Sequence, residues 1–213
     1  MTLAPDIDRI ESERLVLRRI ARADCDFFAR LHAMPEVRRY LGNGRPYSAE
    51  ESRAWVESML ATYERLNLGQ LAVVRKSDGQ LIGRCGLSDL VVEAHGAPSG
   101  IPRGWFRRAQ APGGIELIYA PDLGYALDPG SWGHGYAAEA ARCVFEYART
   151  NPAWKCIVSV IHPGNLRSLR VAERSGLRHA GQIEIAERVM EQYVWPGCHE
   201  QPNVAVHPSG ARE

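Results

Sequence analysis

The alternation of apolar and polar residues near the start of the chain predicts a strand followed by two helices. Residues 14–19 (RLVLRR) alternate in the way that a half-buried strand does. Asp24 stands before an apolar stretch, so we expect it to cap a helix that runs through Leu31. Residues 48–51 (SAEE) form a capping box, which opens a longer amphipathic helix to about Leu66.

The middle of the chain combines a hairpin pattern with a stretch that has no pattern. Two apolar runs, 71–74 and 81–87, surround the turn sequence Ser77-Asp78-Gly79 and predict a β-hairpin. Residues 93–114 are rich in Gly and Pro without any period, so we expect a long loop or insertion there. Strand character returns over 115–127, with a bulge expected at Pro121 and Asp122 because proline cannot donate to a ladder.

The last part of the chain predicts a helix, a buried strand, a second helix and an antiparallel pair. Apolar residues recur at helical spacing over 136–148, and residues 155–161 form a β-branched run. Asn165 is expected to cap a helix that ends at Gly176, and the segments 182–185 and 189–194 to pair. Residues 196–213 are polar and predict a flexible tail. This order predicts one mixed α/β domain over 10–195.

Composition and charge exclude several classes of protein. The chain has 213 residues, 45% of them hydrophobic, and a formal net charge of +1, so neither a general nucleic-acid partner nor an anionic membrane is expected. No apolar run approaches the roughly 20 residues of a membrane span, and the N-terminus lacks a secretion signal. Five cysteines lie far apart without metal-ligand spacing. We therefore expect no metal, free thiols and a cytoplasmic location.

The segment 131–140 (SWGHGYAAEA) is the first candidate for chemistry. Gly133 and Gly135 lie between an expected strand and an expected helix, so backbone N–H groups of the first helical turn can point at an anion. The segment is not a Walker A loop, and Ala138 stands where a dinucleotide fingerprint would have its third glycine. Taken alone, the pattern fits a phosphate cradle and an ordinary glycine-eased turn equally well.

The segments 122–140 (DLGYALDPGSWGHGYAAEA) and 162–177 (HPGNLRSLRVAERSGL) together resemble the GNAT acyltransferase superfamily, specifically its RimJ/RimL-like branch. Trp132 takes the Q/R place of the pyrophosphate signature Q/R-x-x-G-x-G/A, and Leu177 stands where the family usually has Phe. Weaker matches occur at 14–20, 34–42 and 81–87. The resemblance implies a central mixed, mostly antiparallel and splayed sheet flanked by helices.

The resemblance also implies where acetyl-CoA would bind. The pantetheine arm would lie between two splayed strands, on backbone groups of Tyr125 and Leu127, with Asn165 bonding a pantetheine amide. Asn165 is equally interpretable as a helix cap. The pyrophosphate would be held by one continuous segment and the thioester end by Ser168; the segment comprises Trp132, Gly133, His134, Gly135, Tyr136 and Ala137.

Three residues are candidates for proton transfer during acyl transfer to an amine. Asp122 stands where many relatives have Glu, and Glu187 lies in a phrase that resembles ribosomal-protein acetyltransferases; either would accept the ammonium proton. Asp122 can instead be a turn residue, and Glu187 a solvated hairpin charge. Ser168 would face the departing sulfur, or simply be small. Ala172 fills the place of the family's usual tyrosine acid, which favours Ser168. His134 is expected to be a solvent-facing loop residue.

These observations predict an N-acetyltransferase that acts on a protein N-terminus or a small amine. A non-catalytic coenzyme A-binding domain is the main alternative, and a dinucleotide-binding protein is a weaker one because no early βαβ unit is present. Aromatic and basic residues of the 93–114 insertion, Trp105 among them, suit contact with the acceptor or with a second copy of the chain. They suit equally well a mobile surface loop whose aromatic side chains pack back onto the domain. The sequence does not identify the acceptor.

Overall fold

The computed structural model describes residues 8–93, 104–105, 117–151, 154 and 156–195. Within these ranges the helices are α1 (Cys25–Ala33), α2 (Pro35–Arg38), α3 (Ala49–Leu66), α4 (Tyr136–Ala148) and α5 (Leu166–Arg174). The strands are β1 (Arg9–Glu11), β2 (Leu15–Arg19), β3 (Gln70–Arg75), β4 (Leu81–Ser88), β5 (Val91–Glu93), β6 (Gly104–Trp105), β7 (Leu117–Tyr119), β8 (Asp122–Leu127), β9 (Val158–Ile161), β10 (Arg178–Ile185) and β11 (Arg188–Val194).

Hydrogen bonding places eight strands in the order β1-β2-β3-β4-β8-β9-β11-β10, and β6-β5-β7 form a second, smaller sheet. Among the strand pairs whose register the described residues define, all are antiparallel except β8 with β9. The expected mixed, mostly antiparallel sheet flanked by helices is confirmed. The chain divides into two compact units, Met1–Leu87 with Leu123–Pro152 and Ser88–Asp122 with Ala153–Glu213. Each unit is described in turn, and a single domain over 10–195 stays a prediction.

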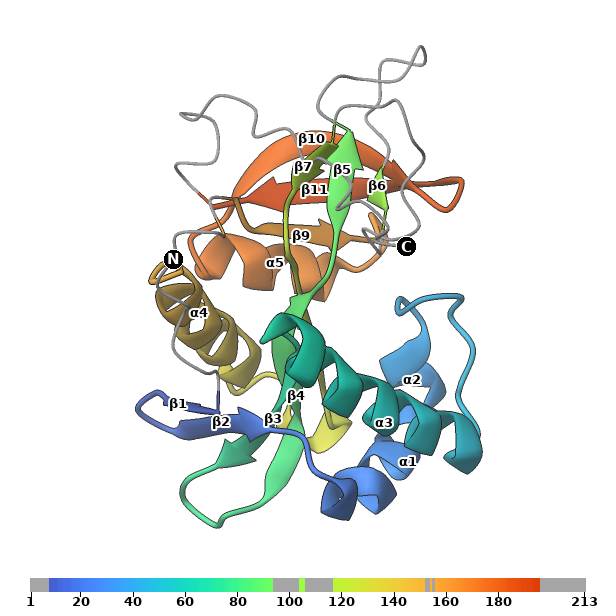
Figure 1. Cartoon of the computed structure of the whole chain (residues 1–213), viewed down its shortest axis with the longest axis vertical. Coiled ribbons are helices and arrows are strands. Elements are labelled where there is room, and N and C mark those ends of the chain that lie inside the picture. The colour runs from blue at the N-terminus through green and yellow to red at the C-terminus, as the bar shows by residue number, and fades with distance from the viewer. Residues whose placement is uncertain (1–7, 94–103, 106–116, 152–153, 155, 196–213) are drawn as a thin grey trace, which may run out of the picture. The chain divides into compact units, whose positions relative to one another are not determined.

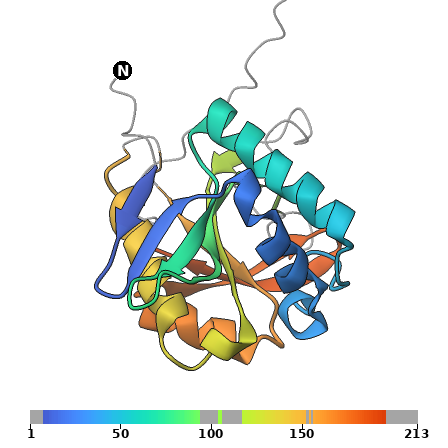
Figure 2. The same ribbon diagram turned by 90° about the horizontal axis from the view of Figure 1, so that it is seen from below.

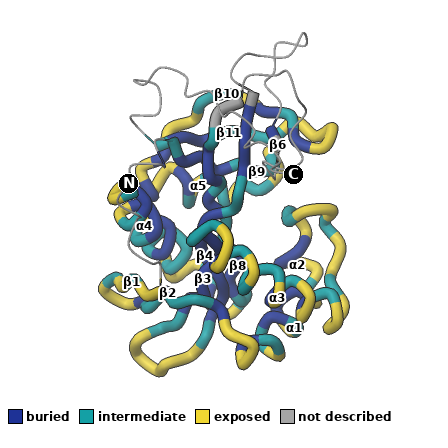
Figure 3. Tube along the Cα trace, in the orientation of Figure 1, coloured by how far each residue is buried: buried dark blue, intermediate teal, exposed yellow. Residues whose placement is uncertain are grey.

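In the first unit, an antiparallel meander carries helices on both faces. α1 and α3 pack against one face and α4 lies at the other (Figures 1 and 2). Buried apolar residues fill the space under α1 and α3, with Trp132 packed at the edge of the cluster; the buried members are Ile20, Phe28, Leu31, Val37, Val56, Ala72 and Ala126. Figure 3 shows β3 and β4 as the most continuously buried part of this unit. The core therefore fixes the strands from which the site loops depart.

Two of the local predictions for the first unit are confirmed in atomic detail. Ser48 Oγ accepts the Glu51 N–H at 3.1 Å, and Glu51 Oε2 accepts the Ser48 N–H at 2.8 Å, so the capping box starts α3. Gly79 has φ +69° in the turn between β3 and β4 and faces open space. Glycine suits this turn because its left-handed backbone is costly for other residues.

The expected role of Asp24 is wrong in part. Asp24 does precede α1, but its side chain does not cap that helix. Its carboxylate instead accepts two hydrogen bonds from Arg18, at 2.7 and 2.8 Å, and one from the Ala21 N–H at 2.9 Å. The Asp24 carboxylate binds Arg18 instead of the helix because a charged, bidentate guanidinium forms stronger hydrogen bonds than a backbone N–H group does.

In the second unit, β9, β11 and β10 form a sheet against which α5 packs. Apolar side chains from this sheet, from β5 and from the residues next to β5 and β7 make its core; they are Leu90, Val92, Ala120, Val158, Ile183, Ile185 and Val194. The expected pairing of the last two strands is confirmed, and its turn consists of Ala186 and Glu187 at φ +48° and +61°. β9 begins at Val158, later than the predicted 155.

The patternless segment 93–114 was expected to be a loop throughout. This is wrong for Gly104 and Trp105, which form β6 and pair with Val92 and Val91. Two residues are too few to show alternation, so sequence pattern could not reveal the strand. Glu93, the first residue of the segment, ends β5. Residues 94–103 and 106–114 and the predicted tail, 196–213, lie outside the described residues.

Candidate functional site

The glycine segment forms a tight connection between β8 and α4 in the first unit. A 3-10 turn, Pro129–Ser131, follows the strand, and Asp128 Oδ1 accepts the Gly130 N–H at 2.9 Å. Gly133 and Gly135 both adopt left-handed backbone, at φ +81° and +82°. A Cβ on Gly133 would meet nothing within 4 Å, so the backbone conformation rather than crowding within the protein requires glycine there.

The start of α4 has the features of an anion site. Gly135 is its N-cap and supplies no side-chain hydrogen bond to the first turn. The N–H groups of Tyr136 and Ala137 begin the helix, where intrahelical acceptors do not exist, and the helix dipole favours negative charge at this end. Gly133, His134 and Gly135 are all exposed. A diphosphate can therefore approach the backbone directly.

Trp132 anchors the loop to the strand that precedes it. Its indole Nε1–H donates to the Leu127 carbonyl at 2.8 Å, while the ring packs against the first-unit core. Backbone groups of Leu127 are expected to meet the pantetheine arm, which stays a prediction; its carbonyl oxygen accepts the hydrogen bond from this indole. Tyr125, two residues earlier on β8, is half-buried. Trp132 thus contributes by positioning the loop.

His134 behaves as a loop residue. Its Nδ1 lies 2.8 Å from the Trp132 carbonyl oxygen, and its ring stacks on Tyr136 with centroids 5.7 Å apart. These contacts orient the side chain along the loop surface. They give no support to a catalytic base at this position.

Glu139, Ser12 and Arg14 form a set of polar contacts, called here the clamp, that holds the same loop. The sequence did not reveal it. Glu139, in the first turns of α4, accepts hydrogen bonds from the Ser12 hydroxyl at 2.7 Å, the Arg14 N–H at 2.8 Å and the Arg14 Nε at 2.7 Å. Arg14 also donates to the His134 carbonyl at 3.1 Å and lies 4.7 Å from the Tyr136 ring. Only the resemblance phrase GYAAEA hinted that Glu139 mattered, and it did not name a partner.

Asn165 and Ser168 share the first turn of α5 in the second unit. Asn165 is the N-cap, and its Oδ1 accepts the Ser168 N–H at 3.3 Å. The expected cap is confirmed, and both residues are half-buried. A contact of either side chain with pantetheine stays a prediction.

Asp122 lies where β8 meets β9. The register of this parallel pair consists of Asp122 with Val158, and the Val158 N–H donates to the Pro121 carbonyl at 3.0 Å. The next inward N–H of β9, from Val160, donates to the Asp122 side-chain Oδ1 at 2.9 Å. A continued ladder would send this N–H to a backbone carbonyl. The carboxylate therefore substitutes for the ladder at the point where an expected splay begins.

The structure does not bring Glu187 close to Asp122. Glu187 is exposed in the β10–β11 turn. The Asp122 carboxylate bonds the Val160 N–H, and Val160 pairs with Gln192 of β11. Five residues of extended strand separate Glu187 from Gln192, which is roughly 16 Å. The two carboxylates therefore cannot both contact the same ammonium proton. A role as general base for either one stays a prediction.

Two thiols are unsuited to covalent catalysis. Burial raises the pKa of Cys143 to about 11 and that of Cys85 still further. The nucleophilic form of cysteine is the thiolate. Among the described residues, no group of three His, Cys, Asp or Glu side chains could hold a metal ion. No helix in the described ranges is long and apolar enough to cross a membrane.

Comparison with known proteins agrees with this geometry. Residues 14–178 match the family model described as an acetyltransferase (GNAT) domain, so the chain belongs to that family. An uncharacterized N-acetyltransferase of Bacillus subtilis, YoaA, is 24% identical over 186 residues, which cover 87% of this chain and 88% of that protein. An acetyltransferase structure from Agrobacterium tumefaciens has a TM-score of 0.67 and 25% identity, covering 92% of this chain and 98% of the other.

A further solved structure concerns RimL, the ribosomal L7/L12 alpha-N-protein acetyltransferase, in complex with coenzyme A. It has a TM-score of 0.63 and 18% identity, covering 88% of this chain and 97% of that one. At this identity the likeness shows the fold alone.

Proposed function

We propose that this chain transfers an acetyl group from acetyl-CoA to a primary amine, on a protein N-terminus or a small molecule, as a member of the RimJ/RimL-like branch. The observation that carries the proposal is the pair of exposed, left-handed glycines before α4, whose first turn has no side-chain cap. This arrangement fits a diphosphate, because no side chain caps the N–H groups in the first turn of α4. Membership of an acetyltransferase family and the coenzyme A-bound RimL structure support it.

The chain's own residues would act by holding and orienting the cofactor. Backbone N–H groups of 133–137 bind the diphosphate, and Trp132 and Glu139 keep that loop in place. The family resemblance implies that Tyr125, Asn165 and Ser168 would contact the pantetheine arm. The bound thioester supplies the acetyl group, and the amine attacks it directly in a ternary complex. The raised pKa values of Cys85 and Cys143 support direct attack, because neither thiol ionises readily to form an acyl-enzyme.

Two proton movements are required. The amine must lose a proton before attack, and the departing thiolate must gain one. We assign the second task to the Ser168 hydroxyl. The first falls to Asp122 or Glu187, or to solvent. Since Asp122 already accepts the Val160 N–H, the geometry favours a positioning role for it.

The test is a panel of primary amines and peptides mixed with acetyl-CoA, with release of free thiol as the readout. Thiol release that depends on an amine supports the proposal. The occupation of Asp122 by a backbone N–H favours one alternative, a non-catalytic coenzyme A-binding domain. Calorimetric binding of acetyl-CoA without thiol release on any amine would select that alternative. Absence of acetyl-CoA binding would contradict both.

A further inference from the structure

Helix α5 of the second unit presents a row of side chains to solvent, on the side that faces away from the sheet. Leu166, Arg170 and Arg174 are spaced four residues apart, so they follow one another along one side of the helix. All three are exposed, and Leu166, at 60%, is one of two large apolar residues exposed in the described part of the chain. The opposite side carries the buried Ala172 and packs against β9 and β10. We refer to Leu166, Arg170 and Arg174 as the α5 row.

The two arginines of the α5 row lack an anionic partner within the described part of the chain. Glu173 is the one carboxylate of α5, and it accepts a hydrogen bond from the Tyr193 hydroxyl of β11 at 3.5 Å. Like charges four residues apart repel and slightly destabilise a helix. The helix dipole favours Arg174 in the last turn, but it does little for Arg170 in the middle. The stability of α5 therefore does not explain the row.

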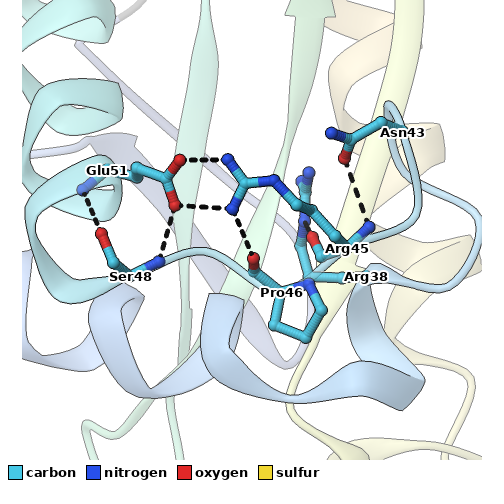
Figure 4. A network of polar contacts seen from close by, with 6 residues as sticks. All are labelled: Arg38, Asn43, Arg45, Pro46, Ser48 and Glu51. Carbon is cyan, nitrogen blue, oxygen red and sulfur yellow. Dashed lines mark hydrogen bonds and ion pairs between the residues drawn. The ribbon is translucent and has the colours of Figure 1, made fainter.

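Several exposed arginines of the first unit are, by contrast, compensated by a carboxylate. Arg45 Nη1 donates to Glu51 Oε2 at 2.9 Å, beside the start of α3 (Figure 4). Arg149, at the end of α4, pairs with Glu146 three residues earlier, with Nη1 3.0 Å from Oε2. In α5 the position one turn after Arg170 holds a second arginine instead of a carboxylate. The α5 row is thus a positive surface that remains available to an anion from outside the chain.

The α5 row begins next to the residues that are proposed to meet the pantetheine arm. Leu166 directly follows Asn165, and Ser168 lies on another side of the same helix. Along the helix axis, Arg170 is about 3 Å and Arg174 about 9 Å beyond Ser168. An extended peptide advances about 3.3 Å per residue. A peptide whose N-terminus lies at Ser168 can therefore bring residues only a few positions further on to the row.

We propose that the α5 row docks an acidic segment of a protein acceptor, close to the N-terminus that receives the acetyl group. The inference rests on the proposed function and selects a protein N-terminus over a small amine. Guanidinium groups bind carboxylates through paired, charge-assisted hydrogen bonds, and Leu166 adds an apolar contact beside them. A leucine within the row and a formal net charge of only +1 favour a peptide over a nucleic acid, whose binding depends on aromatic stacking and a large basic excess.

Two matched peptides test the inference on the wild-type protein with acetyl-CoA. Both have the same first residues, and one continues in a run of Glu where the other has a run of Gln. We expect kcat/KM to be ~5- to 30-fold higher for the Glu peptide, the combined effect of a few exposed ion pairs. The advantage should shrink as salt is raised from ~0.05 to ~0.5 M, because salt screens exposed charges. Equal values for the two peptides at low salt would overturn the inference while leaving the acetyl transfer intact.

Double variants locate the effect in the α5 row. Arg170→Gln with Arg174→Gln should remove the advantage of the Glu peptide and leave kcat/KM for the Gln peptide unchanged, whereas Lys at both positions should retain part of the advantage. Arg53→Gln with Arg65→Gln is the matched control, because it removes the same net charge from exposed positions of α3 and should keep the full advantage. Equal loss in both double variants would indicate long-range attraction and overturn the docking. A fall in acetyl-CoA affinity confined to the α5 variant would assign the row to the cofactor and also overturn it.

A binding experiment keeps the inference testable if turnover is absent on every amine. The Glu peptide, the Gln peptide and a single-stranded oligonucleotide are titrated calorimetrically into the full chain with coenzyme A at low salt. Tighter binding of the Glu peptide than of the Gln peptide, lost in the α5 double variant and retained in the α3 control, supports the docking even if the proposed acetyl transfer fails. The inference is overturned if the two peptides bind equally, or if the oligonucleotide binds more tightly than the Glu peptide and depends on the same arginines.

Discussion

The Nε of Arg14 lies 2.7 Å from Oε2 of Glu139, which joins the connection between β1 and β2 to the helix that follows the glycine loop, across 125 positions of sequence. Burial raises the pKa of Glu139, but the Arg14 N–H, the Ser12 hydroxyl and the Arg14 guanidinium outweigh it and hold the pKa below its ordinary value. The carboxylate is therefore ionised at neutral pH. Through Arg14 it reaches the His134 carbonyl inside the loop itself.

Loss of this clamp should loosen the loop. We expect Glu139→Ala to lower the free energy of unfolding by ~1 to 3 kcal/mol, since it leaves the Arg14 and Ser12 donors without their acceptor. Acetyl-CoA affinity should fall with it. Glu146→Ala is the control, because Glu146 is exposed on the same helix and, in the described part of the chain, its ion pair is with nearby Arg149. Denaturant unfolding and calorimetry measure the two effects, and equal behaviour of the two variants would contradict the clamp.

Gly135 offers a direct test of the diphosphate site. Gly135→Glu places a negative side chain at the N-terminus of α4 and should weaken acetyl-CoA binding more than ~10-fold. Gly79→Glu is a matched control, since Gly79 has a similar φ of +69° and open space around it. Both substitutions should cost ~1 kcal/mol or more through backbone strain. Calorimetric titration with acetyl-CoA compares them, and an equal affinity in both would exclude the assigned site.

Ser168 should affect turnover without affecting binding. If its hydroxyl supports the departing thiolate, Ser168→Ala should lower kcat by ~10²-fold at little change in acetyl-CoA affinity. Ser175→Ala serves as the comparison, because the Ser175 hydroxyl only donates to the Val171 carbonyl at 2.7 Å within the same helix. Steady-state kinetics on one acceptor settle the matter: full turnover in Ser168→Ala returns this serine to a packing role.

Two substitutions distinguish the two possible roles of Asp122, acceptance of the substrate proton and acceptance of the Val160 N–H. Asp122→Asn keeps an oxygen for the Val160 N–H, so we expect it to retain stability and the rise of rate with pH. Asp122→Ala leaves that N–H without its acceptor and should cost ~1 to 3 kcal/mol. Glu187→Gln, in the exposed turn, is expected to change neither. A pH–rate profile that loses its rising limb in Asp122→Asn would show that Asp122 is the base.

His32 predicts a pH dependence of stability. Its pKa is about 3 in the folded protein, mainly because of burial, and about 6.5 in the unfolded chain. Between these values the unfolded chain binds the extra proton, so the free energy of unfolding falls as the pH drops, by up to ~1.4 kcal/mol per unit. The free energy of unfolding is measured with urea at several pH values between 6.5 and 5. It should fall less steeply with decreasing pH in His32→Phe than in the wild type. Identical dependence of stability on pH in the wild type and in His32→Phe would contradict the burial of a neutral His32.

Sequence signals succeeded where the interacting partners are close along the chain. The Ser48–Glu51 box and the turn at Gly79 are each complete within a few residues, so residue type alone predicts them. Asp24 shows the limit of this approach, because Arg18, a residue on the preceding strand, competes successfully for the carboxylate. A pattern cannot rank two such partners without their geometry.

The site itself was recoverable only in part. Glycines and the helix start identified the phosphate loop, since the chemistry depends on a continuous stretch of backbone. The Arg14–Glu139 clamp depends on contacts between distant segments. Charged residues at those positions are indistinguishable in sequence from ordinary surface charges.

The burial of Cys85 and Cys143 affects how these cysteines would react with the coenzyme A that acetyl transfer releases. Each acetyl transfer liberates coenzyme A, whose oxidised disulfide form can couple to any cysteine that ionises. Burial raises the pKa of Cys143 to about 11 and that of Cys85 further, so almost none of either is thiolate near neutral pH. These two cysteines should resist mixed-disulfide formation and alkylation, and should contribute little background to a thiol-detection assay on the folded protein.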